Sequence, residues 1–389
     1  MRVAQICTNV MSGSVGTIVR NIYDGLTTNG DDCLILFGRG KLPTGYNSYK
    51  FDKEFDIYFH LTMARLFDSD GLYSRHATKR LIHKLKEFNP DVVHIHCLHG
   101  YYLNYPMLFN FFKEENLKVV WTMHDCWAYT GHCCYYDYPL CNKWKDKSCK
   151  KCQNKKSYPK TMFFSKSNRN FYKKKNSFLG LSNLKIVTPS QWLKDELSNS
   201  FFKDECCKVI NNGININIFN SDVTVKKEKF ILGVASIWDE RKGLKDFIEL
   251  KKLLPDDITI QIVGASTTQV RLLKEHKIKA IGRTSSVDEL VDYYRKALFF
   301  FNPTYEDNYP TVNIESIACG TPVITYDTGG SGELIKKYNF GRIIENKDYK
   351  SILNIINDTE KNKRIEEVEV MYLSSNYMVE QYIDLYTNW

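Results

Sequence analysis

The chain has 389 residues, of which 43% are hydrophobic and 25% charged, as expected for a packed globular protein of two domains and not for a disordered one. No apolar run in the sequence reaches the roughly 18 residues of a membrane span. Residues 1–9 are typical of a buried strand followed by a Gly/Ser loop, and not of a signal peptide. Integral-membrane, fibrous and exported toxin-like proteins are therefore excluded, and a cytoplasmic protein is expected.

Short apolar runs rich in β-branched residues recur along the chain, each followed by a longer segment with helical spacing. The runs are 3–7, 33–37, 92–96, 118–122 and 185–188 in the first half, and 230–234, 258–263, 298–302 and 323–326 in the second. Apolar strands that alternate with helices predict parallel sheets covered on both faces. Two such sets predict two doubly wound α/β domains, with the junction in the Asn- and Gly-rich stretch 209–219.

The first predicted strand ends in the loop 9–16, which contains Gly13 and Gly16 and precedes a predicted helix over 17–26. Ligands of parallel sheets bind at the carboxyl ends of strands, and a glycine loop at a helix N-terminus exposes N–H groups that can hold phosphate. The spacing matches neither GxGxxG nor a Walker loop. A plain glycine turn is the simpler interpretation of this loop alone.

A basic insert, about residues 130–178, interrupts the alternation of strands and helices. Residues 141–175 hold 13 Lys or Arg and a single acidic residue, whereas the formal net charge of the whole chain is only +9. The basicity is therefore local. Anionic lipid headgroups, an anionic substrate or nucleic acid would explain it, and a solvated loop is the alternative.

The same insert contains five of the twelve cysteines. Without an export signal, a disulfide framework is a poor explanation. Cys149 and Cys152 form a CxxC pair, and with Cys141 and one of Cys133 or Cys134 they offer four thiolates for a closed, structural Zn²⁺ site. We take Cys133 as the fourth ligand, and free thiols are the alternative.

Histidines follow two predicted strands of the first half. In "HIHCLHG", His94 and His96 share one face of the strand, which would allow a metal pair. The spacing supplies no third ligand, so a role in a binding pocket or in the core is favoured. His124 follows the next strand, in "WTMHDCW", where a structural role at the strand end is the alternative to a functional one.

In the second half, the loop 236–243 carries Arg241 and Lys242 directly before Gly243. Two cations at a strand end suit a diphosphate, although solvated charges at a helix start are the simpler explanation of this loop alone. The strand 298–302 is followed by "PTYEDNYPTVNIESIACGTPV". Pro310 suits the start of a helix, whose amides at Thr311, Val312 and Asn313 are then expected to be unpaired, as a phosphate site requires.

Two carboxylates accompany that predicted helix. Asp307 lies in the loop before it, and Glu315 lies on its first or second turn. A carboxylate accepts two hydrogen bonds side by side, as the vicinal hydroxyls of a ribose require, and the other carboxylate would hold sugar hydroxyls. A partnership with the helix dipole is the alternative for either carboxylate alone.

Asp307 and Glu315 are separated by seven residues, and "CGTPV" follows at 319–323. This pattern resembles the signature of the family 4 retaining glycosyltransferases with the GT-B fold, of the bacterial surface-polysaccharide type. The resemblance covers nearly the whole chain. It implies two Rossmann-like domains that face each other across a cleft. Residues 1–210 would bind the acceptor, residues 211–374 would bind the nucleotide sugar, and a C-terminal helix over 375–389 would pack back on the first domain.

The resemblance also implies roles for single residues. Glu315 would bind the ribose and Asp307 the donor sugar, although Asp replaces the family's usual Glu and is one methylene shorter. Lys242 matches the lysine that clamps the diphosphate. The usual arginine position is not matched, so Arg241 is the candidate substitute. His124 matches the histidine at the sugar-transfer centre.

Further donor contacts follow from the same resemblance. The helix amides near Val312 and Asn313 would hold the diphosphate, the loop with Gly13 and Gly16 would help to stabilise its charge, and Arg283 in "IGRTSS" lies in the loop that meets the nucleotide base. No metal or other cofactor would be needed for catalysis.

The resemblance implies retaining transfer from a nucleotide-diphosphate sugar to a hydroxyl of a saccharide or lipid-linked acceptor, in exopolysaccharide, capsule or lipopolysaccharide assembly. The basic insert would suit peripheral contact with the inner face of the cytoplasmic membrane. One alternative is an enzyme of the same fold that acts on a free small acceptor or epimerises the sugar. A distant alternative is nucleic-acid binding by the insert, which would leave the carboxylates and glycine loops without a role.

Overall fold

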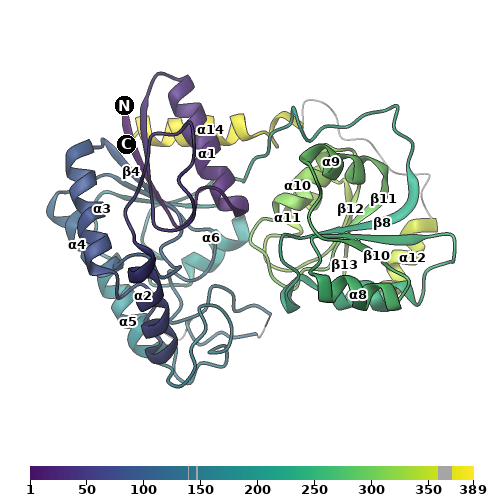
Figure 1. Ribbon diagram of the computed structural model, residues 1–389, viewed down its shortest axis with the longest axis horizontal. Helices are drawn as coiled ribbons and strands as arrows, with labels where there is room; N and C mark the ends of the chain where they lie inside the picture. The colour runs from purple at the N-terminus through teal and green to yellow at the C-terminus, as the bar shows by residue number, and fades with distance from the viewer. Residues whose placement is uncertain (139, 146–147, 358–369) are drawn as a thin grey trace. The chain divides into compact units, whose positions relative to one another are not determined.

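The chain divides into two compact α/β units, shown in Figure 1. The computed structural model describes residues 1–389 apart from 139, 146–147 and 358–369. Unit 1 comprises Met1–Asn211 together with Val379–Trp389, and unit 2 comprises Asn212–Met378. The divisions expected from the sequence lay at 210/211 and 374/375.

Unit 1 is built on a seven-stranded parallel sheet in the order β3-β2-β1-β4-β5-β6-β7. Its strands are β1 (Arg2–Cys7), β2 (Asp32–Phe37), β3 (Ser48–Lys50), β4 (Val92–Ile95), β5 (Val119–Thr122), β6 (Leu184–Thr188) and β7 (Cys207–Val209). Its helices are α1 (Gly13–Thr28), α2 (Glu54–Phe67), α3 (Arg75–Phe88), α4 (Tyr105–Glu114), α5 (Ser167–Phe178) and α6 (Gln191–Ser198). The strand order reverses at β1, as in a doubly wound fold.

Unit 2 repeats this topology in a six-stranded parallel sheet of order β10-β9-β8-β11-β12-β13. Its strands are β8 (Glu228–Val234), β9 (Thr259–Val263), β10 (Lys279–Ile281), β11 (Ala297–Asn302), β12 (Val323–Tyr326) and β13 (Gly341–Ile344). Its helices are the 3₁₀ turn η1 (Glu240–Lys242), α7 (Leu244–Lys251), α8 (Thr267–Glu275), α9 (Val287–Lys296), α10 (Thr311–Ala318), α11 (Glu333–Tyr338) and α12 (Tyr349–Asn357). Here the order reverses at β8.

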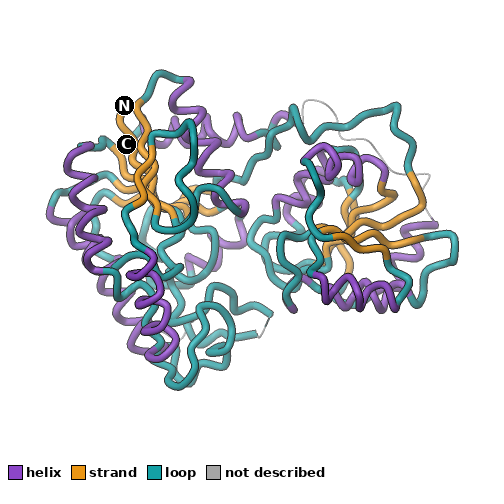
Figure 2. Tube along the Cα trace, viewed as in Figure 1, coloured by secondary structure: helices purple, strands orange, loops and turns teal. Residues whose placement is uncertain are grey.

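Both faces of the unit 2 sheet are buried, which explains why its central strands are continuously apolar. Figure 2 shows its strands in orange between helices in purple. Successive side chains of β8 point to opposite faces. Ile231 belongs to one core cluster with Phe247 of α7, and Leu232 belongs to another with Ile314 of α10.

Four strands were missed by the sequence prediction, namely β3, β7, β10 and β13. They are the outer strands of the two sheets in the described part of the chain. Three of them have three residues and the fourth has four, and most of their side chains are half-buried or exposed. The predicted helix start at residue 17 was also wrong, because α1 begins at Gly13.

The C-terminal helix α14 (Ser375–Thr387) continues from unit 2 into unit 1. The hydroxyl of Tyr382 lies 2.9 Å from that of Thr122 in β5, and the hydroxyl of Tyr386 lies 2.7 Å from Nδ1 of His94 in β4. All four side chains are buried. Residues 379–389 thus complete the core of unit 1. None of the helices in the described residues combines the length and apolar character that crossing a membrane requires.

Candidate active site

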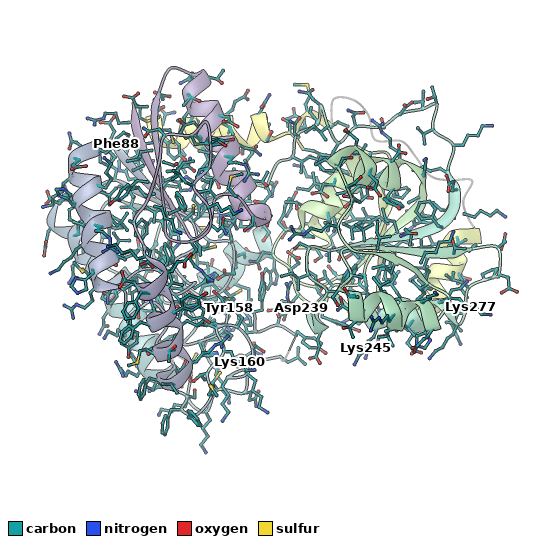
Figure 3. All side chains as sticks on the ribbon, viewed as in Figure 1. Phe88, Tyr158, Lys160, Asp239, Lys245 and Lys277 are labelled. Carbon is teal, nitrogen blue, oxygen red and sulfur yellow. The ribbon has the colours of Figure 1, made fainter. Side chains whose placement is uncertain are left out.

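Two loops of unit 2 meet where its strand order reverses, beyond the carboxyl ends of β8 and β11. This is the position at which doubly wound sheets bind ligands. The backbone N–H of Tyr305 donates to the carbonyl of Arg241 at 2.8 Å and so joins the two loops. Gly243 has φ +70°, and a Cβ on it would lie 2.2 Å from the carbonyl oxygen of Pro303. Only glycine therefore allows this approach. Figure 3 labels Asp239 and Lys245, which flank η1 in the same loop region.

A charged cluster lies at this junction. The Lys242 ammonium donates to Oδ2 of Asp307, and a guanidinium nitrogen of Arg241 lies 3.8 Å from the same oxygen. Each of the three side chains is between 17% and 19% exposed. Burial by itself raises the pKa of Asp307, but the two cations outweigh it and hold this pKa below its ordinary value. Arg241 also lies 3.7 Å from a carboxylate oxygen of Asp239, which is 50% exposed. Two adjacent cations whose partners are carboxylates can pass to an anionic group that enters the site.

The loop that carries Asp307 is anchored by a buried carboxylate. Asp246 of α7 is only 3% exposed and accepts hydrogen bonds from three tyrosine hydroxyls: Tyr305 at 2.8 Å, Tyr326 at 2.8 Å and Tyr349 at 2.7 Å. Tyr305 stands two residues before Asp307. Shared hydrogen bonds of this kind stabilise one arrangement of the loop. The sequence analysis did not select Asp246, since its partners lie 59 to 103 residues away.

Glu315 lies on α10, half-buried, and accepts a hydrogen bond from the hydroxyl of Tyr294 at 3.0 Å. Burial raises the pKa of Glu315 to about 7, although the hydrogen bonds from Tyr294 and Thr311 partly oppose the shift. Glu315 therefore titrates near neutral pH. Only its ionised form can accept hydrogen bonds at both oxygens.

The N-terminus of α10 presents two of the three amides expected there. Pro310 is the N-cap, and the half-buried Thr311 and Val312 begin the helix, where the first N–H groups have no intrahelical acceptor. The prediction for Asn313 was wrong, because its N–H donates to the carbonyl of Pro310 at 3.1 Å. Its side chain is buried and bonded to Asn302 and Ser331. Asn313 thus holds the helix in place and offers no amide.

The other predicted donor residues belong to other elements of the two units. Arg283 is exposed, after the outer strand β10, which β9 and β8 separate from β11. In unit 1, a Cβ on Gly16 would lie 2.5 Å from the carbonyl oxygen of Val10, so glycine allows the loop to pack on α1. At Gly13, which has φ +74°, a Cβ would meet nothing within 4 Å.

In unit 1, His124 follows β5 and lies beside a histidine that follows the neighbouring strand β4. Its Nε2 is 3.1 Å from Nδ1 of His96, and the rings are stacked with centroids 5.4 Å apart. Burial lowers the pKa of His124 to about 4, so the ring is neutral at physiological pH. His94 and His96 serve the core: His94 bonds to Thr122 and His96 to Gln5.

A second acid–base group near His124 was missed by the sequence analysis. Nε2 of His99 lies 2.6 Å from Oδ2 of Asp125, and Nδ1 of His99 lies 2.9 Å from the hydroxyl of Tyr158 in the insert. Burial lowers the pKa of His99, but the Asp125 carboxylate outweighs it and holds this pKa well above its ordinary value. His99 and Asp125 both stand in the quoted strand-end motifs, but their pairing required knowledge that β4 and β5 are adjacent.

Side chains able to hold a metal occur in two places in unit 1. Ligand atoms of Cys97, His99 and Asp125 all lie within 4.8 Å of one another. The ion pair between His99 and Asp125 is sufficient to explain why these atoms are close. The four cysteines predicted to bind zinc line a single pocket in the insert: Cys133, Cys141, Cys149 and Cys152.

Comparison with known proteins assigns the class. The pattern described as "Glycosyltransferase Family 4" matches residues 15–218, and that described as "Glycosyl transferases group 1" matches residues 215–372. Sucrose-phosphate synthase of Thermosynechococcus elongatus superposes with a TM-score of 0.70 at 14% identity, covering 100% of this chain and 98% of that one. HepE of Anabaena in complex with UDP-glucose gives 0.65 at 13% identity, with full coverage of both chains. The two parallel sheets therefore have the GT-B architecture of glycosyltransferases.

The chain belongs to glycosyltransferase family 4. A relative that it matches along the full length of both chains, at 22% identity, is the Escherichia coli K12 protein named "Putative colanic acid biosynthesis glycosyl transferase WcaC". The Campylobacter jejuni N,N'-diacetylbacillosaminyl-diphospho-undecaprenol alpha-1,3-N-acetylgalactosaminyltransferase is also 22% identical, over 43% of this chain and 47% of that protein. The protein is thus a glycosyltransferase, similar to proteins named for polysaccharide and lipid-linked saccharide assembly.

Proposed function

We propose that this glycosyltransferase moves a sugar from a nucleoside-diphosphate donor to a hydroxyl of a saccharide or lipid-linked saccharide, with retention of configuration. The observation that carries the proposal is the cluster of Lys242, Arg241 and Asp307 at the strand-order reversal of unit 2. Two similar proteins support the proposal. The HepE structure is a complex with UDP-glucose, and the Campylobacter enzyme is named for an undecaprenol-linked saccharide acceptor.

The chemistry proposed for this site is stabilisation of the leaving group. As the bond between the anomeric carbon and the phosphate oxygen breaks, negative charge grows on the nucleoside diphosphate. Lys242 and Arg241, with the amides of Thr311 and Val312, would oppose that charge from fixed positions. Glu315 would accept hydrogen bonds from the ribose hydroxyls, and its ionised form is suited to accept two.

Retention would follow from attack on the face from which the phosphate departs. The acceptor oxygen bonds to the anomeric carbon, and the acceptor proton passes to the departing phosphate oxygen, so no enzymic nucleophile is needed. Asp307, paired with Lys242 in the free protein, would turn to the donor sugar once the diphosphate takes over the ammonium. His124, neutral at pH 7, would hydrogen-bond a hydroxyl at the transfer centre.

A screen of donors tests the proposal directly. We expect one of UDP-, GDP-, ADP- or dTDP-linked sugars to raise the melting temperature of the protein, because a ligand that binds only the folded state stabilises it. Product analysis with and without a saccharide acceptor then separates transfer from epimerisation, and NMR of the new linkage reports the anomeric configuration. An inverted product, or donor turnover to an epimer without acceptor, would contradict the proposal.

A contact with anionic membranes is the second part of the proposal. In the insert, Met162, Phe163 and Phe164 are 58%, 62% and 60% exposed, and Lys156 and Lys160 nearby are also exposed. Apolar side chains beside lysines suit the headgroup region of an anionic bilayer.

We expect the protein to co-sediment with vesicles that contain phosphatidylglycerol and to remain in solution with pure phosphatidylcholine. Serine at both Phe163 and Phe164 should reduce the bound fraction severalfold, whereas Val223→Ser, at a 69% exposed apolar residue of unit 2, should not. Equal binding to the anionic and the uncharged vesicles would exclude a specific contact with anionic membranes. Retention of single-stranded RNA or DNA on a filter, without lipid binding, would favour the nucleic-acid alternative.

A further inference from the structure

The segment between β5 and α5 needs a source of stability other than backbone pairing. Its described residues, 123–138, 140–145 and 148–166, form no helix or strand. Irregular segments of this length are uncommon inside compact domains. A small aromatic group partly fills its interior: the Trp144 ring centroid lies 4.8 Å from that of Tyr129 and 4.9 Å from that of Tyr136. The remainder surrounds a pocket lined with sulfur.

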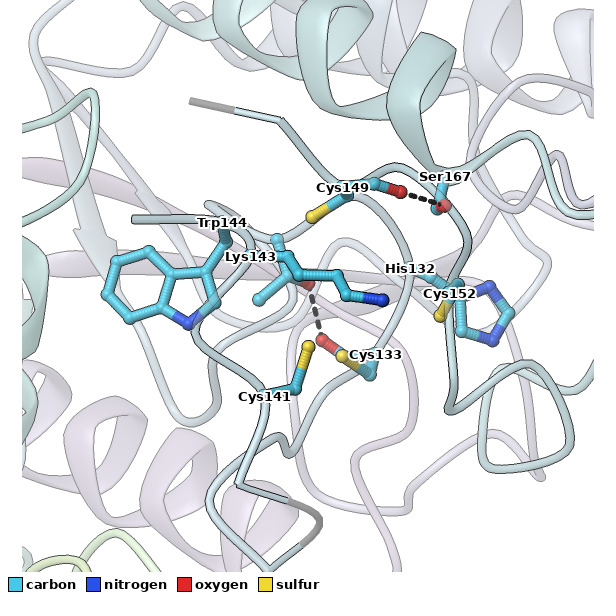
Figure 4. A pocket seen from close by; sticks show the side chains of 9 residues that line it. His132, Cys133, Cys141, Lys143, Trp144, Cys149, Cys152 and Ser167 are labelled. Carbon is cyan, nitrogen blue, oxygen red and sulfur yellow. Dashed lines mark hydrogen bonds between the residues drawn. The ribbon is translucent and has the colours of Figure 1, made fainter. Parts of the chain in front are cut away.

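Four of the six cysteines of this segment line that pocket (Figure 4), and they come from three separate stretches of the loop: Cys133, Cys141, and the pair Cys149 and Cys152. The adjacent Cys134 does not line this pocket, and the charged groups that influence its pKa include Asp125 and His99, outside the pocket. The structure therefore distinguishes two adjacent cysteines that the sequence analysis could not. All four thiols in the pocket are free of disulfides.

The backbone around the pocket already donates hydrogen bonds to sulfur. The N–H of Gly131 donates to Sγ of Cys149 at 3.2 Å, and the N–H of Asn154 donates to Cys152. Such bonds suit metal-bound thiolates, whose charge they offset. A Cβ on Gly131 would lie 2.1 Å from the carbonyl oxygen of Ser167 and 2.6 Å from Cβ of Cys149. Only glycine therefore lets this amide reach the sulfur.

The pocket also attracts positive charge. Lys143 lines the same pocket (Figure 4), and its ammonium donates to the carbonyl of Lys151, in the CxxC turn, at 2.8 Å. The buried Lys174 is close enough to Cys133 and Cys149 for their charges to influence its pKa. Four thiolates around a divalent ion would have a net charge of −2, which two neighbouring lysines can offset.

Contraction of the pocket would close a tetrahedral site. No three of the four sulfurs lie within 4.8 Å of one another, whereas sulfurs that share a zinc at ~2.3 Å are about 3.8 Å apart. A bound metal would draw the CxxC turn and Cys141 towards Cys133 through movements of irregular loop alone.

We propose that this pocket binds one structural Zn²⁺ through four thiolates: Cys133, Cys141, Cys149 and Cys152. The site would be closed, with no position left for water, and so would not take part in the transfer reaction. Its role would be to hold the insert, which places the Tyr158 hydroxyl against His99 and presents the exposed apolar residues at 162–164.

Metal analysis of the full chain, purified without chelators or immobilised metals, tests the proposal. We expect about one zinc per chain by plasma mass spectrometry. Growth with Co²⁺ should give the intense visible absorption of tetrahedral thiolate coordination. Because zinc binds thiolates and must displace the thiol protons, its affinity should fall as the pH is lowered.

Matched cysteines provide the controls. Cys149→Ser and Cys152→Ser should lose most of the metal, whereas Cys134→Ser and the exposed Cys206→Ser should retain it. The far-UV circular dichroism spectrum, compared with that of the wild type, reports whether a metal-free variant has folded. Two results would overturn the proposal: a folded protein without zinc or cobalt and with reduced thiols, or disulfides among the four cysteines. Loss of metal in Cys134→Ser but not in Cys133→Ser would overturn the ligand assignment.

Discussion

Lys242→Ala is expected to lower kcat/KM for sugar transfer by about 10²- to 10³-fold, the usual effect of removing one fixed donor to a developing charge. Lys242 lies after β8, and its ammonium donates to Asp307. From this position the ammonium can exchange Asp307 for a phosphate of the donor without leaving the site. The loss should appear mainly in kcat, because the interaction strengthens as the leaving group gains charge.

The matched control for Lys242→Ala is Lys245→Ala. Lys245 lies three residues further along, is exposed, and belongs to the same loop-to-helix region, so its replacement should leave transfer within about twofold. The double variant Lys242→Ala/Asp307→Asn should be less impaired than the product of the two single effects, because each residue is the partner of the other. Near-normal turnover in Lys242→Ala would contradict the assignment.

Glu315→Gln is expected to weaken donor binding while stabilising the free protein at alkaline pH. Burial raises the pKa of Glu315 to about 7 in the folded state, against an ordinary value of 4.5. A carboxyl group whose pKa is raised by folding stabilises the fold when protonated, and this contribution is lost as the pH rises through the folded pKa. The wild type should therefore lose on the order of 1–3 kcal/mol between pH 5 and pH 8 from this group, and the glutamine variant should not.

Thermal unfolding of both proteins at pH 5 and pH 8 measures the effect. The melting temperature of Glu315→Gln relative to the wild type should increase with pH. The contributions of other titrating groups, such as Asp52 of unit 1, whose pKa burial raises to about 7, are the same in both proteins and cancel in this difference. Nucleoside-diphosphate affinity should fall by about 10- to 100-fold at pH 8, as expected for loss of a charged hydrogen-bond acceptor. Tyr294→Phe, which removes the 3.0 Å bond to Glu315, should lower the stability at pH 8. A melting difference that does not change with pH would contradict the buried position of this carboxylate.

The sequence predicts the central strands of both sheets because both faces of those strands are buried, as Ile231 and Leu232 show. It does not predict β3, β7, β10 and β13, because an outer strand needs apolar residues on fewer positions and is recognised only by its pairing. The same reason accounts for the site. Lys242 and Asp307 were visible within local motifs, whereas Asp246 with its tyrosines, and His99 with Asp125, depend on contacts between distant segments. Asn313 was misjudged because its bond to Pro310 depends on the local turn geometry.

The crossing of α14 determines how this enzyme can be dissected. A recombinant fragment that stops at Asn211 would lack Tyr382 and Tyr386. It would leave Nδ1 of the buried His94 unpaired, at about 1–3 kcal/mol, and would remove one of the two bonds of the Thr122 hydroxyl. Gly25 of α1, against which the side chain of Val379 packs, would also be exposed to water. An isolated unit 1 fragment should therefore be produced with residues 379–389 fused by a short linker or added as a synthetic peptide. Any affinity tag at the C-terminus should be separated from Trp389 by a spacer.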